Sequence, residues 1–492
     1  MRVSPWTRAG AFAAVCVAGI LACGEPPNRP PPPAGNASAT TADSSNLAVA
    51  ARLEQSVWNQ SPPPYTTEKH WALMRRVYDG AHYAPLWFSG GAPTAAGRRL
   101  IVALCEALDE GIHPAAFAAD SGAWDTTTAA GRAASDLRLS AALLELVASR
   151  TRGQVAPGTV APEWRAPPPA EPDDSLLAAW LREPSSTGRP TGLPQPPAYL
   201  AQAFARFHRT ALAGGWELPD TVGTLRPGVR DSAVVSLRRR LIRSGDLPPA
   251  DSAGTTYDAA VAAAVRRAQG RLGLHADGVA GPATWSALAV PAMNRARRIA
   301  ANLERYRWLP TAPAGAALVI DAAARTVTLR VGRELAFDAP GELTVRCLAT
   351  LPPILADTIR AVKRRGSGFE LELAGGRSLW WAAAADSGCV QVEGLSRLAS
   401  ALDRTVPVIL YLVAPTVQAD ADGRIRFHTD PSGSDERLDA ALEPVLSRST
   451  PPVCGPVSPS SGPPPAGTRD SALRPRPPAP GRAGTGSARR AD

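Results

Sequence analysis

The sequence predicts a multidomain α+β protein, with a helical N-terminal region, a compact three-helix module and a mostly β C-terminal domain. The chain has 492 residues, which is more than a single hydrophobic core can organise. Apolar residues recur at helical spacing as far as about residue 308, and they alternate with polar residues beyond about residue 315. This change of period separates the helical part from the β part.

The composition argues against nucleic acid as a partner, although the formal net charge is +9. Lys69 and Lys363 are the two lysines among 53 basic residues, and such an arginine-rich, lysine-poor chain is typical of a GC-rich genome. Residues 451–492 hold six Arg against two Asp, which accounts for +4 of the charge. The chain lacks the basic stripe interleaved with aromatic residues that a nucleic-acid groove requires.

The N-terminus predicts export. The apolar run over residues 9–22 is too short to span a bilayer and has the length of a signal-peptide core. Its last residues, directly before Cys23, resemble the lipobox of bacterial lipoproteins. The resemblance implies that residues 1–22 are removed and that Cys23 is acylated, so that the lipid alone holds the protein on the periplasmic side of the cell envelope. Gly24 favours the outer membrane, by resemblance to lipoprotein sorting rules; the alternative is an ordinary secretory peptide in which Cys23 has no role.

Two segments are expected to be disordered. Residues 23–47 begin with a Pro-rich stretch, and residues 447–492 are rich in Pro, Gly and Arg. Neither segment holds enough apolar residues to offset the chain entropy that is lost on folding. The first segment would serve as a flexible tether between the lipid anchor and the folded body.

Residues 48–216 are expected to form the helical region. Leucines repeat every four residues over 100–108, which predicts an amphipathic helix. A second helix is predicted over 136–152 and ends at Gly153. The Pro-rich segment 157–198 is expected to be a long surface loop.

Residues 225–291 show a three-helix pattern that contains an informative turn. The turn Asp277-Gly278-Val279-Ala280-Gly281-Pro282-Ala283-Thr284 resembles the Asp-Gly-x-x-Gly-x-x-Thr signature of the small peptidoglycan-binding domain. The resemblance implies that the module binds peptidoglycan, with Asp277, Gly278, Gly281 and Thr284 as its signature residues. Ala268 departs from the family, which usually has Phe at this position. The alternative is a helical spacer that binds nothing.

Residues 315–446 are expected to form the mostly β domain. Apolar and polar residues alternate over 326–331, which predicts a half-buried strand. Residues 343–347 are predicted to form another strand, with Cys347 on its apolar face as a core residue. A short helix and two later strands are predicted over 394–403, 406–413 and 416–427, respectively.

One motif in this domain carries chemistry. The sequence Asp386-Ser387-Gly388-Cys389-Val390-Gln391-Val392 resembles the nucleophile motif of L,D-transpeptidases, Ser-His-Gly-Cys-Ile-Arg-Val. The order of helical scaffold, peptidoglycan-binding module and β domain also resembles the large murein L,D-transpeptidases. The resemblance implies that Cys389 attacks a carbonyl of a peptidoglycan stem peptide and passes the acyl group to an amine on a neighbouring stem. Gly388 would let the substrate approach, backbone N–H groups would stabilise the oxyanion, and neither a cofactor nor a metal is expected.

The motif departs from the family at two positions. Ser387 replaces the motif His, and Gln391 replaces the motif Arg. The family's catalytic His lies on a strand shortly before the nucleophile, but no His occurs between residues 276 and 427. The interval from residue 352 to Cys389 looks too short to hold that strand, and His428 falls where the family has a non-catalytic residue. A thiol of ordinary pKa needs a base or a cation beside it to form the thiolate at neutral pH.

Three hypotheses therefore stay open. Cys389 could be an active nucleophile with an unrecognised partner, which makes the protein a peptidoglycan L,D-transpeptidase of impaired activity. The domain could be degenerate, which makes the protein a catalytically inactive peptidoglycan-binding envelope lipoprotein or a lipid-tethered spacer. Cys389 could form a disulfide with Cys347, because Cys105, Cys347, Cys389 and Cys454 could pair in an oxidising envelope and show no metal-binding spacing.

Overall fold

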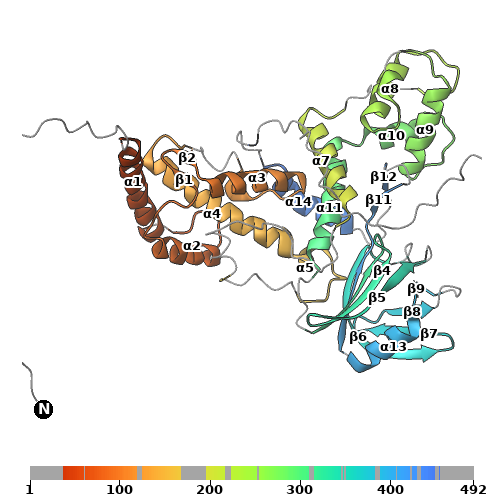
Figure 1. Cartoon of the computed structure of the whole chain (residues 1–492). Coiled ribbons are helices and arrows are strands. Elements are labelled where there is room, and N and C mark those ends of the chain that lie inside the picture. Colours follow the sequence, from red (N-terminus) through yellow and green to blue (C-terminus); the bar gives the residue numbers. More distant parts are fainter. Residues whose placement is uncertain are drawn as a thin grey trace, which may run out of the picture.

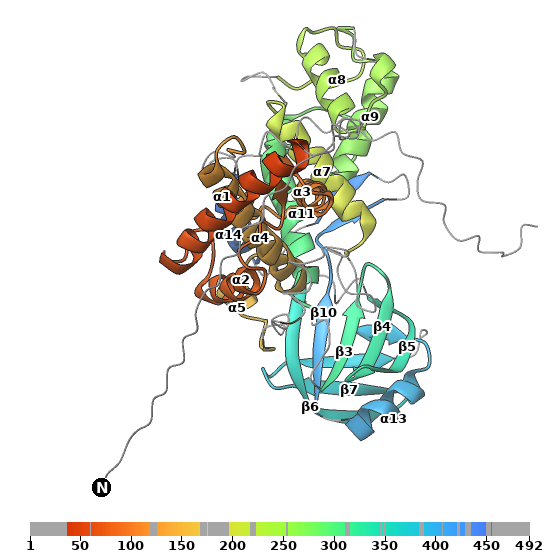
Figure 2. The same ribbon diagram turned by 60° about the vertical axis from the view of Figure 1, so that its left-hand side comes forward.

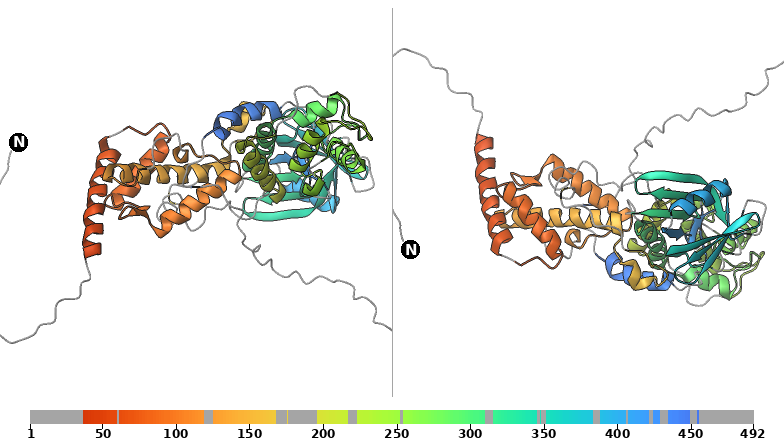
Figure 3. Two further views of the ribbon diagram at one scale, coloured as in Figure 1. Left: turned by 90° about the horizontal axis from the view of Figure 1, so that it is seen from above. Right: turned by 90° about the horizontal axis from the view of Figure 1, so that it is seen from below.

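The computed structural model describes residues 37–59, 61–118, 125–167, 175, 196–216, 223–251, 254–309, 315–344, 347, 351–382, 388–405, 407–420, 424–428, 434–448 and 454. Figure 1 shows an elongated helical region, a small helical module and a β-barrel. Figure 3 shows from above and below that the elongated region extends away from the other two parts. The predicted α+β fold class is therefore confirmed.

Four helices form the elongated region: α1 (Ala37–Asn59), α2 (Glu68–Gly80), α3 (Ala95–Asp109) and α4 (Ala129–Arg152). The 3-10 helix η1 (Ala115–Phe117) and the short strands β1 (Phe88–Ser89) and β2 (Ala92–Pro93) complete it. The predicted leucine repeat lies on the buried face of α3. The predicted end of α4 at Gly153 is confirmed, but α4 begins before residue 136. It begins earlier because Thr128 caps it, with the Thr128 hydroxyl accepting a hydrogen bond from the Gly131 N–H at 3.0 Å.

The helix α1 corrects one prediction. It begins at Ala37, so the prediction of disorder over 23–47 is wrong for residues 37–47. Val49, Leu53 and Val57 recur every four residues and are buried in the core of the elongated region. No Pro or Gly interrupts the sequence between Ala37 and these residues, so the helix extends toward the N-terminus. Residues 1–36, which include the predicted signal peptide and Cys23, lie outside the described residues. Within the described part of the chain, no helix combines the length and apolar character needed to cross a membrane.

A second group of helices joins the elongated region to the barrel. It consists of α5 (Pro157–Val160), α7 (Ala198–Leu212), α11 (Ala292–Arg307) and α14 (Ser434–Leu446). α11 packs along α7 and α14, and Trp164 is buried in the same core. Trp164 also forms a β-bridge with Ala356 of the barrel. The prediction of a surface loop over 157–198 is therefore wrong at its start, because Pro157 begins a helix; apart from Ser175, residues 168–195 lie outside the described part.

The small module has the three predicted helices: α8 (Ala233–Arg243), α9 (Ala259–Arg271) and α10 (Pro282–Ala289). The 3-10 helix η3 (Pro249–Asp251) lies between the first two. Apolar residues from all three helices form one core: Val234, Leu237, Leu241, Val261, Val265, Ala268, Trp285 and Leu288. The three-helix prediction is confirmed, and Ala268 is fully buried in this core.

The β domain is a closed eight-stranded barrel with strand order β10-β3-β4-β5-β9-β8-β7-β6. Its strands are β3 (Ala316–Asp321), β4 (Thr326–Val331), β5 (Glu334–Leu343), β6 (Ile354–Arg365), β7 (Gly368–Leu373), β8 (Ser378–Ala382), β9 (Val390–Val392) and β10 (Val408–Val413). The pairs β10–β3 and β8–β9 are parallel, and the others are antiparallel. Figure 2 shows β6, β10, β3, β4 and β5 following one another around the barrel, with α13 (Leu395–Thr405) beside it. The strands β11 (Val417–Ala419) and β12 (Ile425–Phe427) form a separate two-stranded sheet.

Two predictions for this domain are wrong. β5 ends at Leu343, and Cys347 lies in a helical turn rather than on a strand. The turn is marked by the Cys347 N–H, which donates to the Thr344 carbonyl at 2.9 Å. The interval before Cys389 is not short of strands either, because β6, β7 and β8 all lie within it. Tight turns at Gly366 and Gly376, both with positive φ, let three strands fit into this interval.

Candidate functional site

Cys389 lies directly before β9, between two neighbouring strands of the barrel. Its N–H donates to the Trp380 carbonyl of β8 at 2.7 Å, and its carbonyl accepts from the Thr344 N–H at 3.0 Å. These hydrogen bonds tie the Cys389 backbone to β8 on one side and to the end of β5 on the other. The residue is half-buried.

Gly388 is required by packing in this structure. A Cβ atom at Gly388 would lie 2.5 Å from the Ala382 Cβ and 2.9 Å from the Ala382 nitrogen. The absence of a side chain therefore lets the segment before β9 lie against β8, which is a different role from the predicted approach of substrate. Gln391 lies in β9, opposite Glu342 of β5 and Ala382 of β8. Ser387 lies outside the described residues.

Cys389 forms a disulfide with Cys347. The two Cα atoms are 5.4 Å apart, and the bond joins the start of β9 to the helical turn that follows β5. A thiolate is the nucleophile in cysteine catalysis, and a sulfur atom held in a disulfide has no thiolate form. The site as it stands is therefore closed to acyl transfer through Cys389.

No histidine reaches this site. All six histidines are among the described residues, and none lies in the barrel: His70, His82, His113, His208, His275 and His428. His428 follows β12 in the separate two-stranded sheet, where its N–H donates to the Thr416 carbonyl at 2.7 Å. The barrel therefore has no imidazole that could take a proton from Cys389.

Two other histidines are buried but lie in the helical part. The rings of His113 and His208 meet edge to face, with their centroids 5.1 Å apart. Burial lowers the pKa of His113 to about 3 and the pKa of His208 to about 4, and the neighbouring imidazole adds to the shift at His113. Both rings are therefore neutral at physiological pH and belong to the helical core.

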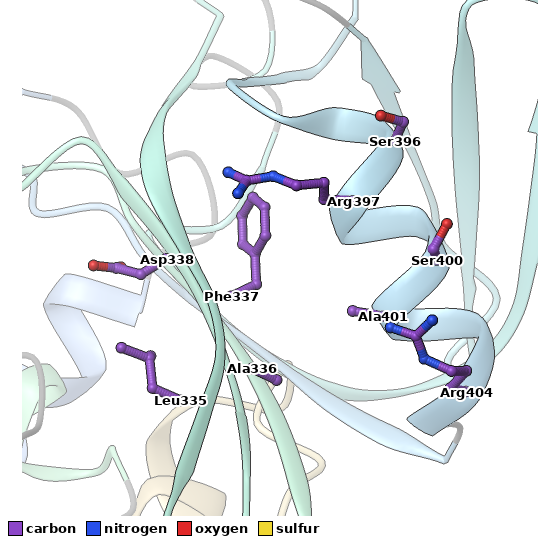
Figure 4. A pocket seen from close by; sticks show the side chains of 9 residues that line it. All are labelled: Leu335, Ala336, Phe337, Asp338, Ser396, Arg397, Ser400, Ala401 and Arg404. Carbon is purple, nitrogen blue, oxygen red and sulfur yellow. The ribbon is translucent and has the colours of Figure 1, made fainter.

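The barrel also has a groove that the motifs do not predict. It lies between β5 and α13, has a volume of about 610 Å³ and contains none of the predicted site residues. Figure 4 shows the Phe337 ring pointing from β5 toward the Arg397 side chain, with Arg404 further along α13. The Arg397 guanidinium carbon is 5.8 Å from the centroid of the Phe337 ring. No sequence motif marks this groove, because its residues come from two elements far apart in the chain. Among the described residues, no group of three or more His, Cys, Asp or Glu could hold a metal ion.

The signature residues of the three-helix module surround the side chain of Gln269. The Gln269 Nε2 donates to the Asp277 carboxylate at 2.8 Å and to the Thr284 hydroxyl at 3.1 Å. Its Oε1 accepts from the Gly278 N–H at 2.9 Å, and Gly278 has a φ of 79°. Gly281 precedes Pro282, the first residue of α10. The structure therefore brings the four predicted residues together as a hydrogen-bonded turn, and their direct contact with peptidoglycan stays a prediction.

Comparison with known families identifies two modules. The family described as "Scaffold domain" matches residues 72–201, and the family described as "Putative peptidoglycan binding domain" matches residues 230–288. They occur in the order that the resemblance to the murein L,D-transpeptidases predicts, ahead of the β domain, and the resemblance is confirmed for these two modules. No curated protein sequence matches the chain.

Three solved structures illustrate the distant similarities of the chain. An L,D-transpeptidase from Xylanimonas cellulosilytica is 16% identical, covers 40% of this chain and 99% of its own, and has a TM-score of 0.15. An L,D-transpeptidase from Stackebrandtia nassauensis is 18% identical over 39% of this chain and 96% of its own, with a TM-score of 0.18. A fused Zn-dependent amidase/peptidase/peptidoglycan-binding domain-containing protein from Clostridium acetobutylicum is 14% identical over 39% and 100%, with a TM-score of 0.17. At these scores the three similarities support no conclusion. The chain is thus a three-part protein in which a Scaffold domain and a peptidoglycan-binding domain precede a closed β-barrel.

Proposed function

We propose that this protein is a peptidoglycan-binding protein of the cell envelope whose transpeptidase-like barrel does not catalyse acyl transfer. The observation that carries the proposal is the state of Cys389. The one candidate nucleophile is bound to Cys347 in a disulfide, and no histidine lies in the barrel.

The absence of a histidine base is expected to lower the rate of acyl transfer strongly. Loss of a general base reduces a rate by about 10²–10⁴-fold, and Gln391 cannot supply the positive charge of the family's Arg. Reduction of the disulfide would free the Cys389 thiol without supplying either group. The barrel is therefore expected to remain inactive even when Cys389 is reduced.

The second candidate function is L,D-transpeptidation by the reduced protein. It is favoured by the place of Cys389, which is half-buried at the start of a barrel strand and has Gly388 before it. An unrecognised proton acceptor would have to replace the histidine. Acylation of the reduced protein distinguishes this candidate from the first.

The proposed location follows from the N-terminus and from the disulfides. We infer that Cys23 is lipidated and holds the protein in the envelope, most simply at the outer membrane because Gly24 follows it. Two disulfides, Cys105–Cys454 and Cys347–Cys389, support an oxidising compartment.

Retention on isolated peptidoglycan sacculi tests the proposal. The wild-type chain and Cys389→Ala are expected to sediment with sacculi equally, because the disulfide site takes no part in binding. A chain without residues 225–291 is expected to lose most of this retention. Equal retention without the module, or loss of retention in Cys389→Ala, would contradict the proposal.

A further inference from the structure

A pocket lies between the end of α7 and helix α8 of the three-helix module. We call it the junction pocket; it has a volume of about 460 Å³, which is in the usual range for a small-ligand site. Its walls are Trp216, which follows α7, and three arginines of α8: Arg239, Arg240 and Arg243. Figure 1 shows α8 in the small module and α7 beside α11 in the helical group below it.

Arg240 is buried in this wall without a full set of partners. Only 2% of the residue is exposed. Its Nε donates to the Leu288 carbonyl at 2.9 Å, and its guanidinium carbon is 3.7 Å from the centroid of the Trp216 ring. Its Nη1 is buried and has no hydrogen-bond partner among the residues that the structure describes. A buried cation with an unused donor is costly unless an anion approaches it.

Among the described residues, the charged side chains that act on Arg240 are mostly positive. Arg271, Arg295 and Arg243 all act on Arg240 as like charges, and within the described part of the chain Asp246 opposes them. Asp246 is already engaged, because Arg271 holds its carboxylate at 2.6 Å and the Ser244 hydroxyl donates to it at 2.5 Å.

Burial in this region, together with the neighbouring arginines, affects the pKa of two arginines. Burial, followed by the charge of neighbouring arginines, lowers the pKa of Arg240 to about 9 and the pKa of Arg295 to about 10. An anion bound in the junction pocket beside Arg240 would oppose the shift in the pKa of Arg240.

The rim of the pocket can reach an arriving ligand. Arg239 and Arg243 are exposed, and Arg243 also donates to the Gly215 carbonyl. The Trp216 Nε1 donates to the Val290 carbonyl at 3.2 Å, which fixes the ring between the module and α7. Planar guanidinium groups bind carboxylates through paired hydrogen bonds, and an aromatic wall suits the apolar part of a peptide.

We infer that the junction pocket binds a free carboxylate of a peptidoglycan stem peptide. The inference rests on the proposed function, which brings the chain to peptidoglycan, and it adds the place and chemistry of the contact. A stem tetrapeptide has a free carboxylate at its C-terminus beside short apolar side chains, so the ligand offers both the negative charge and the apolar carbon atoms that this pocket accommodates.

Binding of a soluble stem tetrapeptide tests the inference, with the chain from Gly24 onward and isothermal titration calorimetry. The double variant Arg239→Glu/Arg243→Glu is expected to bind the tetrapeptide at least tenfold more weakly. The matched control is Arg397→Glu/Arg404→Glu, which makes the same charge change in the barrel groove and is expected to bind like the wild type. A tetrapeptide with amidated carboxylates is expected to bind tenfold more weakly to the wild type. Thermal unfolding of each variant confirms that it is folded.

Several outcomes would overturn the inference. If the amidated peptide binds the wild type as tightly as the free acid does, the carboxylate makes no contact with the pocket. If both double variants lose the same affinity for the tetrapeptide, the loss is a general effect of charge. Binding of inorganic phosphate without binding of the tetrapeptide would assign the pocket to phosphate. If the wild type is retained on sacculi, and Arg239→Glu/Arg243→Glu is retained and binds the tetrapeptide as well as the wild type, this inference is overturned and the proposed function is not. Absence of wild-type retention would overturn the proposed function.

Discussion

Replacement of Asp439 by Asn is expected to stabilise the protein at pH 8 and to change its stability little at pH 4. Asp439 lies on α14 one turn after Asp435, in the helical group that joins the scaffold to the barrel. The Asp439 Oδ1 is buried and finds no hydrogen-bond partner in the described part of the chain. Burial, followed by the negative charge of Asp435, raises the pKa of Asp439 to about 7.

The magnitude follows from the difference between the folded and unfolded pKa values. The pKa rises from 3.8 to about 7, and each unit corresponds to about 1.4 kcal/mol, so the full penalty is about 4 kcal/mol. Asp439 is only partly buried, and solvent screening reduces this to about 2 kcal/mol. The folded state holds the extra proton between the two pKa values, so stability falls as the pH rises through this window. The whole penalty is present above pH 7, and the neutral amide of the Asp439→Asn variant would not carry it.

The assay is urea unfolding of wild type and Asp439→Asn at pH 4 and at pH 8. The control is Asp435→Asn on the same helix. Asp435 is fully buried between Arg305 at 2.6 Å and Arg298 at 2.5 Å, so its neutralisation is expected to cost about 3–5 kcal/mol at pH 8. A destabilised Asp439→Asn at pH 8, or a gain that is as large at pH 4, would refute the reasoning.

Three further substitutions test contacts in the three-helix module, in the barrel and between α3 and Cys454. Gln269→Leu leaves the Gly278 N–H without its acceptor and is expected to cost about 1–3 kcal/mol in thermal unfolding; a loss below 1 kcal/mol would contradict the role of Gln269 as the centre of the turn. Gly388→Ala is expected to cost about 1–3 kcal/mol, because the added Cβ meets Ala382; unchanged stability would show that β8 and the Cys389 segment are not in contact. Cys454→Ser opens the disulfide to α3 and is expected to cost about 2–5 kcal/mol under oxidising conditions, with no difference from wild type in reductant; equal stability without reductant would contradict the bond.

The sequence predicts most of the helices and strands because their apolar residues follow a clear period. The leucines of α3 and the alternation in β4 belong to elements with one buried face, and local spacing alone describes such a face. The three helices of the small module are predicted for the same reason, with Gly281 and Pro282 marking the start of the last one.

Local composition misleads where the decisive contacts are distant. Residues 37–47 are polar and look disordered, yet they continue a helix whose later turns are held in the core of the elongated region. Trp164 lies in a Pro-rich segment, but its bridge to Ala356 fixes it against the barrel. Local composition predicts neither the packing of α1 nor the bridge of Trp164, because in both cases the contacting residues are far apart in the sequence.

The candidate site was predictable only in part. The motif identifies Cys389 and Gly388, and the missing histidine is visible by counting. The pairing of Cys389 with Cys347 could only be a hypothesis, because it depends on how β5 and β9 lie together. The junction pocket was not predictable from the sequence, because it forms only where Trp216 lies beside the arginines of α8 in the folded protein.

Intact mass spectrometry of the chain with a stem tetrapeptide, and separately with a carbapenem, tests the central claim most directly. Each incubation is made with the oxidised protein and with protein whose disulfides have been reduced, and alkylation shows that the Cys389 thiol is free in the second case. The account predicts no acyl adduct on Cys389 in either state. An adduct that disappears in Cys389→Ala would contradict it and would show that the barrel is an acyltransferase.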